Sequence, residues 1–181
     1  MPHPFNYLAV QLPDSLRKQM VTIQQMILQI DSGFKPHKFN RIHMTLLFME
    51  YRFKQEKAED LDAFDMKMKE LLESKENGYQ LKFSSTKISL FGHGNLVVME
   101  FIPNADAKLL FDAVLGHLDD GKNGRDFWNP HITLGKLRDK DTDLSGIEEN
   151  LGELVMNEFE SNHIYTAGLS DSNKEKMKWD L

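Results

Sequence analysis

Two short stretches of the chain share the order His, apolar residue, Thr, Leu, and they lie about half the chain apart. Both stretches, which begin at His43 and His131, lie within apolar runs typical of β-strands. Successive side chains of a strand point to opposite faces, so His43 shares a face with Thr45, and His131 with Thr133. The apolar residues between them then face a core, while each His-Thr pair faces a cleft. One such motif is common by chance, but two copies with the same polarity predict a paired functional site.

The composition excludes several classes of site. The chain has 181 residues, enough for one domain with a buried core, and it contains no cysteine. A cysteine nucleophile and a thiolate metal site are therefore excluded. The 22 basic and 28 acidic residues give a net charge of −6, which argues against binding of long nucleic acid through a basic surface. A nucleotide or a short oligonucleotide in a local pocket is compatible with this charge.

The sequence shows no membrane or secretion signal. No apolar run approaches the roughly 20 residues that a membrane-spanning helix needs. The first four residues lack the charged and apolar regions of a signal peptide. We therefore expect a cytoplasmic or nuclear protein that does not bind a membrane, and we expect it to be a monomer.

The hydrophobic periodicity predicts strands and helices in alternation. Short apolar or alternating runs indicate strands, and a stripe with three- to four-residue spacing indicates a helix. The strands are expected at 5–12, around the two motifs, and at 80–91, 95–102, 159–168 and 176–181. The helices are expected at 14–33, at 56–74, after a cap at Asn104, and at 144–154. Each motif strand then lies between two helices, which suggests two similar halves.

The paired His-x-Thr-Leu motifs at this spacing resemble those of the 2H phosphoesterase superfamily. That superfamily includes LigT-like bacterial 2′-5′ RNA ligase proteins, plant cyclic nucleotide phosphodiesterases, the central domain of certain A-kinase anchoring proteins and viral 2′,5′-oligoadenylate phosphodiesterases. The resemblance covers nearly the whole chain and includes Pro130 before the second motif. It implies an α+β fold in which residues 1–181 form one bilobal domain. Two antiparallel sheets would face a central cleft, with the helices outside.

Two histidines that face each other across a cleft can divide acid and base work. One neutral imidazole accepts the proton of a nucleophile and one imidazolium protonates the leaving oxygen, which together contribute about 10²–10⁴-fold. A threonine hydroxyl beside each histidine can donate to the non-bridging phosphate oxygens. We therefore interpret His43 and His131 as catalytic, and Thr45 and Thr133 as phosphate-binding. This scheme needs no metal and no other cofactor, and the sequence leaves open which histidine is the base.

Two other interpretations of the histidines are weaker. A catalytic zinc usually needs three protein ligands, and the third would have to come from His37, His93 or His163. Neither zinc nor a structural role in the core explains why threonine recurs at the same offset. His37 lies in an expected loop and His93 in an expected hairpin turn at 92–95, so both are most simply exposed loop residues.

Two aromatic residues are candidates for contact with a nucleobase. Phe91 lies where the superfamily often places an aromatic residue near the nucleotide, and Trp128 comes just before the second motif. Stacking of a base on an aromatic ring contributes about 1–3 kcal/mol. Ordinary core packing explains either residue equally well, so the sequence leaves both roles open.

The function predicted from these residues is cleavage of a phosphodiester in a short oligonucleotide or nucleotide. The expected bond is a 2′,5′-linkage, as in 2′,5′-oligoadenylate, or a 2′,3′-cyclic phosphate. The nucleophile would be the neighbouring 3′-hydroxyl in the first case and water in the second. The alternative is a sensor module that binds an AMP-like nucleotide in the same cleft without turnover. RNA end joining, the reverse reaction, is a minor third possibility.

Overall fold

The structure, a computed structural model, describes residues 7–48, 59–92, 94–118, 128–150, 153, 155, 158–167 and 177–181. Its helices are α1 (Asp14–Ile30), the short 3-10 helix η1 (Phe39–Arg41), α2 (Glu59–Glu73), α3 (Ala105–Leu118) and α4 (Ser145–Glu148). Its strands are β1 (Tyr7–Val10), β2 (Lys35–Pro36), β3 (Met44–Phe48), β4 (Leu81–Phe91), β5 (Leu96–Pro103), β6 (His131–Lys136), β7 (Glu158–Ser161), β8 (His163–Ala167) and β9 (Lys178–Asp180).

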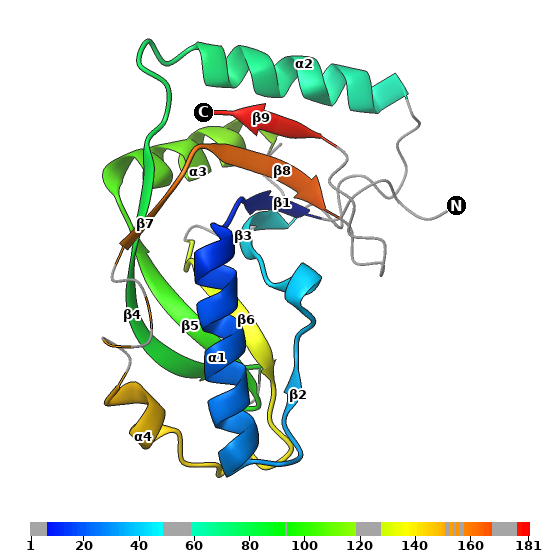
Figure 1. The fold of residues 1–181 in the computed structure, drawn as a ribbon. Coiled ribbons are helices and arrows are strands. Elements are labelled where there is room, and N and C mark those ends of the chain that lie inside the picture. Colours follow the sequence, from blue (N-terminus) through cyan, green and yellow to red (C-terminus); the bar gives the residue numbers. More distant parts are fainter. Residues whose placement is uncertain are drawn as a thin grey trace.

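All of the strands pair antiparallel, in the order β7-β4-β5-β6-β3-β1-β8-β9, with β2 added on β6. Two halves are visible in Figure 1: β4, β5 and β6 run together below, and β1, β8 and β9 lie above. The mixed α+β antiparallel fold predicted from the sequence is confirmed. The two expected sheets are continuous, because β3 and β6 join the halves through the pair Met44–Ile132.

The helices cover the face of the sheet that carries the apolar residues of the motifs. Ile132 and Leu134 of β6 are fully buried and belong to the same core as the buried stripe of α1. The side chain of Gln24 on α1 also donates to the Leu134 carbonyl, with Nε2 to O at 2.6 Å. Figure 1 shows α1 lying over β6, and α2 alongside β9 at the other end of the molecule. The face that carries the histidines is therefore the one turned away from α1, and we call it the motif face.

Most of the predicted elements are present, with shifted ends. Asn104 caps α3 as predicted, since its Oδ1 accepts the Ala107 N–H at 2.9 Å. The expected strand at 159–168 is instead two strands, β7 and β8, with Asn162 between them. Of the helix expected at 144–154, the described part contains α4. Residue 93 lies outside the described residues, so the expected turn at 92–95 is described only in part, by the positive φ of Gly92 and Gly94.

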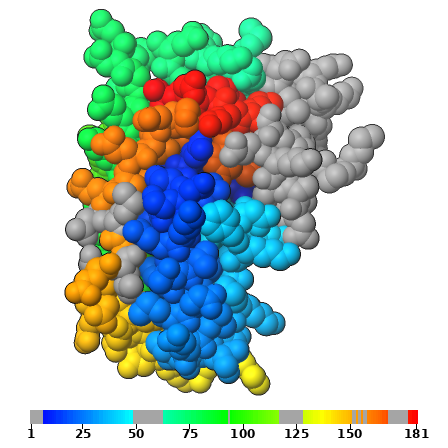
Figure 2. Space-filling model, in the orientation of Figure 1, coloured from blue at the N-terminus to red at the C-terminus, as the bar shows by residue number. Residues whose placement is uncertain are grey.

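The two-residue strand β2 was not predicted. It reaches β6 because Gly135 has no side chain, and a Cβ there would collide with the Lys35 carbonyl and the Phe34 ring. Figure 2 shows α1 and the β2 segment forming one side of the lower half of the molecule. In the described ranges, no helix has the length and apolar character needed to span a membrane.

Candidate active site

The β3–β6 pairing places the two motifs side by side. Met44 and Ile132 are opposite each other and fully buried, so their neighbours in each strand point to the motif face. Continuing the antiparallel register by one residue sets His43 beside Thr133, and Thr45 beside His131. The two His-Thr pairs therefore form a four-residue group, each histidine next to the threonine of the other strand. All four residues are half-buried, as a group that lines an accessible site should be.

Each histidine ring is anchored in the same way. The Nδ1 atom of His43 lies 2.7 Å from the Arg41 carbonyl oxygen, and Nδ1 of His131 lies 2.9 Å from the Asn129 carbonyl oxygen. In both cases the acceptor is the carbonyl two residues earlier in the chain. A carbonyl only accepts, so Nδ1–H donates in both rings, and the Nε2 atoms are left for proton transfer.

Burial governs the protonation of His43. The Tyr7 ring stacks on the imidazole, with centroids 4.5 Å apart and planes at 18°, and Tyr7 is itself buried. The pKa of His43 is lowered to about 4, with burial as the largest cause. The hydrogen bond to the Arg41 carbonyl opposes this change in part, and the positive charges of His37, His131 and Arg17 add to it. His43 is therefore neutral at pH 7, with an unprotonated Nε2 that can accept a proton.

The second histidine has different neighbours. Phe91 meets the His131 ring edge-on, with centroids 5.0 Å apart and planes at 60°. Phe91 is therefore in contact with a motif histidine, and its contact with a nucleobase stays a prediction. Glu100, on β5, is directly opposite His131 in the β5–β6 register. Neither Tyr7 nor Glu100 was identified from the sequence, because both reach the histidines through strand pairings that no local pattern reports.

Trp128 does not belong to this group. Its ring stacks on Phe111 of α3, with centroids 5.4 Å apart, and meets Phe83 of β4 edge-on at 5.8 Å. Its indole N–H donates to the carbonyl of Thr45 at 3.0 Å, so Trp128 stabilises β3 from the core side. These contacts favour core packing, which the sequence left open, over base stacking.

Of the three histidines considered as a third zinc ligand, His37 and His163 lie outside the two motifs, although His37 is near enough for its charge to lower the pKa of His43. His37 is half-buried beside β6, where its backbone N–H donates to the Leu134 carbonyl at 2.8 Å, so it is less exposed than predicted. His163 lies on β8, with Nδ1 at 2.6 Å from Asp180 Oδ1. His93 lies outside the described residues. Within the ranges that are described, no three His, Asp or Glu side chains gather as metal ligands would.

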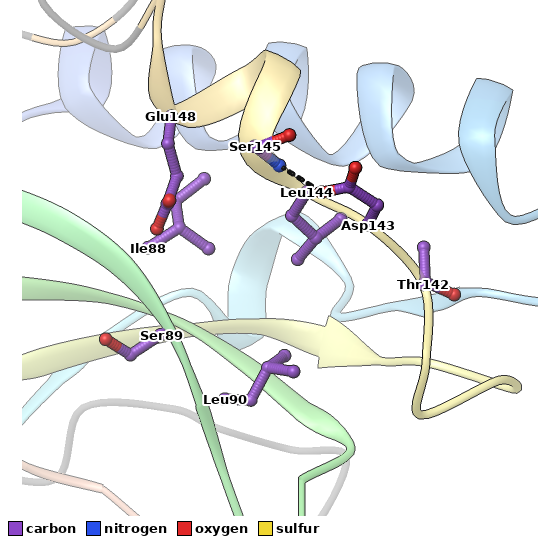
Figure 3. A pocket seen from close by; sticks show the side chains of 8 residues that line it. All are labelled: Ile88, Ser89, Leu90, Thr142, Asp143, Leu144, Ser145 and Glu148. Atoms are coloured by element: carbon purple, nitrogen blue, oxygen red, sulfur yellow. Dashed lines mark hydrogen bonds between the residues drawn. The ribbon is translucent and has the colours of Figure 1, made fainter.

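A separate pocket of about 230 Å³ lies between β4 and the segment leading into α4. Figure 3 shows Ile88 and Leu90 of β4 facing Leu144 and Glu148 across it. None of its lining residues belongs to the two motifs. The paired histidines, and not this pocket, therefore form the candidate active site.

The whole fold matches solved structures closely. LigT of E. coli, in its complex with 3′-AMP, superposes with a TM-score of 0.66 at 14% identity, over 100% of this chain and 99% of LigT. TT0787 of Thermus thermophilus superposes with a TM-score of 0.69 at 16% identity, over 98% and 97% of the two chains. This chain has the 2H phosphoesterase fold. Usb1 of Kluyveromyces marxianus also shares it, with a TM-score of 0.60 at 13% identity, over 98% and 97% of the two chains.

At the level of sequence, no family model matches the chain, and neither does any curated protein. The 2H fold is therefore recognised through the arrangement of its strands and through the two His-x-Thr motifs. LigT has also been crystallised with phosphate, ATP and NADP⁺.

Proposed function

We propose that this chain is a metal-independent phosphodiesterase of the 2H type. Its proposed substrates are 2′,5′-linked oligoadenylate or related short RNAs and 2′,3′-cyclic phosphates. The observation that carries this proposal is the β3–β6 pairing, which sets two identically anchored histidines, each with a threonine beside it, on one face. The 2H fold shared with a phosphoesterase of known structure supports the same reaction class.

In the proposed mechanism His43 is the base. Because it is neutral at pH 7, its Nε2 can take the proton of the 3′-hydroxyl next to a 2′,5′-bond. The 3′-oxygen then attacks phosphorus, and the bond from phosphorus to the 5′-oxygen of the next nucleoside breaks. His131, as the imidazolium, protonates that 5′-oxygen through Nε2. The products are a 2′,3′-cyclic phosphate and a free 5′-hydroxyl; for a cyclic substrate, water replaces the 3′-hydroxyl.

The two threonines complete the proposed site. Negative charge grows on the non-bridging oxygens during attack, and fixed donors aimed at these oxygens lower the barrier. Thr45 lies beside His131 and Thr133 beside His43, so one donor would accompany each proton-transfer group. Phe91, in contact with His131, is the proposed surface for the leaving nucleoside.

The test is a product analysis on 2′,5′- and 3′,5′-linked trinucleotides and 2′,3′-cyclic nucleotides with EDTA present. We expect cleavage by the unmodified protein and a loss of at least about 10³-fold in His43→Ala and in His131→Ala. His163→Ala is the matched control, because it removes an imidazole from the same sheet but outside the motifs. Full activity in either motif variant would refute the mechanism.

Nucleotide binding without turnover is the second candidate, because LigT, which shares this fold, was crystallised in complexes with ATP and NADP⁺. Equilibrium dialysis of AMP and of 2′,5′-linked diadenosine, followed by analysis of the recovered ligand, separates the two functions. Recovery of bound but uncleaved dinucleotide after long incubation would favour the sensor.

A further inference from the structure

A carboxylate lies next to the second motif histidine. Glu100 is opposite His131 across the β5–β6 pair, and directly opposed residues of neighbouring strands point to the same face. The flanking residues confirm the face, because Met99 and Phe101 are buried in the core on the other side. Thr45 lies on the far side of His131, so the motif face carries Glu100, His131 and Thr45 in one row across three strands.

Among the described residues, the ion pair that this carboxylate makes is long and exposed. The Glu100 side chain is only 17% exposed, and the ammonium group of Lys87 lies 4.0 Å from its Oε1. The Lys87 side chain is 65% exposed, so water screens the pair and weakens it. A carboxylate that is largely removed from water and only weakly paired is costly to keep charged, and such a cost is typical of a residue kept for function.

We propose that Glu100 is a specificity residue that admits a leaving nucleoside ending in hydroxyl groups and rejects one that carries a terminal phosphate. This inference rests on the proposed function, in which His131 protonates the leaving oxygen. The leaving nucleoside then lies on the Glu100 side of the scissile phosphate. A further phosphate there would face an incompletely neutralised carboxylate, whereas a ribose hydroxyl could donate to it.

The expected size of the discrimination follows from Coulomb's law. Like charges about 8 Å apart near a protein surface repel by about 1–2 kcal/mol, which is about tenfold in affinity. The Debye length is of similar size at physiological salt, so the discrimination should shrink as salt is raised. The positive charge of Lys87 partly offsets the negative charge of Glu100, so removing the charge of Lys87 should enlarge the discrimination.

The test compares two substrates that differ only at the leaving end. One is 2′,5′-linked diadenosine with free terminal hydroxyls, and the other carries an added 2′-phosphate. The measured quantity is kcat/KM for the hydroxyl-terminated substrate divided by kcat/KM for the phosphorylated one. We expect this ratio to fall about tenfold in Glu100→Gln, which keeps the side-chain shape, and to rise in Lys87→Gln. Glu100→Ser is the second variant, and thermal unfolding confirms that each variant is folded.

A binding measurement, in which no substrate is cleaved, separates this inference from the proposed function. In the His43→Ala background, which lacks the proposed base, the affinities of the same two dinucleotides are measured with and without Glu100→Gln. A preference for the hydroxyl-terminated dinucleotide that shrinks in Glu100→Gln supports the role of Glu100. An unchanged preference, or none, overturns that role. Absence of cleavage by the unmodified protein would instead overturn the phosphodiesterase.

Discussion

Replacement of Tyr7 by leucine should make His43 easier to protonate. The Tyr7 ring lies flat against the imidazole, at 4.5 Å between centroids, and shields that face from water. Burial is the main reason that the pKa of His43 lies at about 4. Leucine keeps the position apolar but does not cover the flat face of the ring, so water can solvate the imidazolium.

The structure sets the size of the effect. The pKa of His43 lies at about 4, well below its usual value of 6.5. We expect the Tyr7→Leu change to raise this pKa by about one unit. One unit corresponds to about 1.4 kcal/mol of differential stabilisation of the charged ring. The neutral fraction of His43 at pH 4.5 would then fall from about three quarters to about one quarter, which lowers a base-dependent rate about threefold. At pH 7 we expect His43 to be neutral in both proteins, so the rates should differ little.

Two measurements check this prediction. NMR titration of the imidazole carbons follows His43 directly, and the acidic limb of the kcat/KM profile follows it through catalysis. Tyr7→Phe is the matched control, because it keeps the stacked ring and should keep the midpoint of the unmodified protein. Identical titration midpoints of His43 in Tyr7→Leu and Tyr7→Phe would refute the idea that the stacked ring shields His43 from water.

Three further substitutions test the two threonines and Trp128. Thr45→Val and Thr133→Val remove a hydroxyl at nearly constant shape, and each should lower kcat about 10- to 100-fold with a smaller change in KM, as measured in steady-state assays; a change confined to KM would contradict a transition-state role. Trp128→Phe removes the donor to the Thr45 carbonyl, and it should lower the free energy of unfolding in urea by about 1 kcal/mol while leaving KM unchanged. A rise in KM of about tenfold would restore base stacking as the role of Trp128.

Local sequence patterns were enough to identify the face of each motif residue. Alternation along a strand requires His43 and Thr45 to point together, and the structure has the intervening Met44 fully buried. The helix cap at Asn104 was equally local, since its acceptor and donor are three residues apart. In both cases the residues that decide the outcome lie within one turn or one strand.

The partners of the histidines could not be found in this way. Tyr7 is far from His43 in the sequence, and Glu100 meets His131 only through the β5–β6 register. Periodicity specifies which face a side chain occupies, but not which strand lies next to it. The role of Trp128 was undecided for a related reason, because a large aromatic ring fits a core and a binding surface equally well.

The narrow junction between β3 and β6 has a mechanical consequence. The proposed acid and the proposed base belong to different halves of the sheet, and those halves meet through the Met44–Ile132 pair. Sliding of one half against the other would therefore change the distance between the two imidazoles. A phosphodiester that contacted both strands would link the two halves. The bound substrate would then help to fix the distance between His43 and His131.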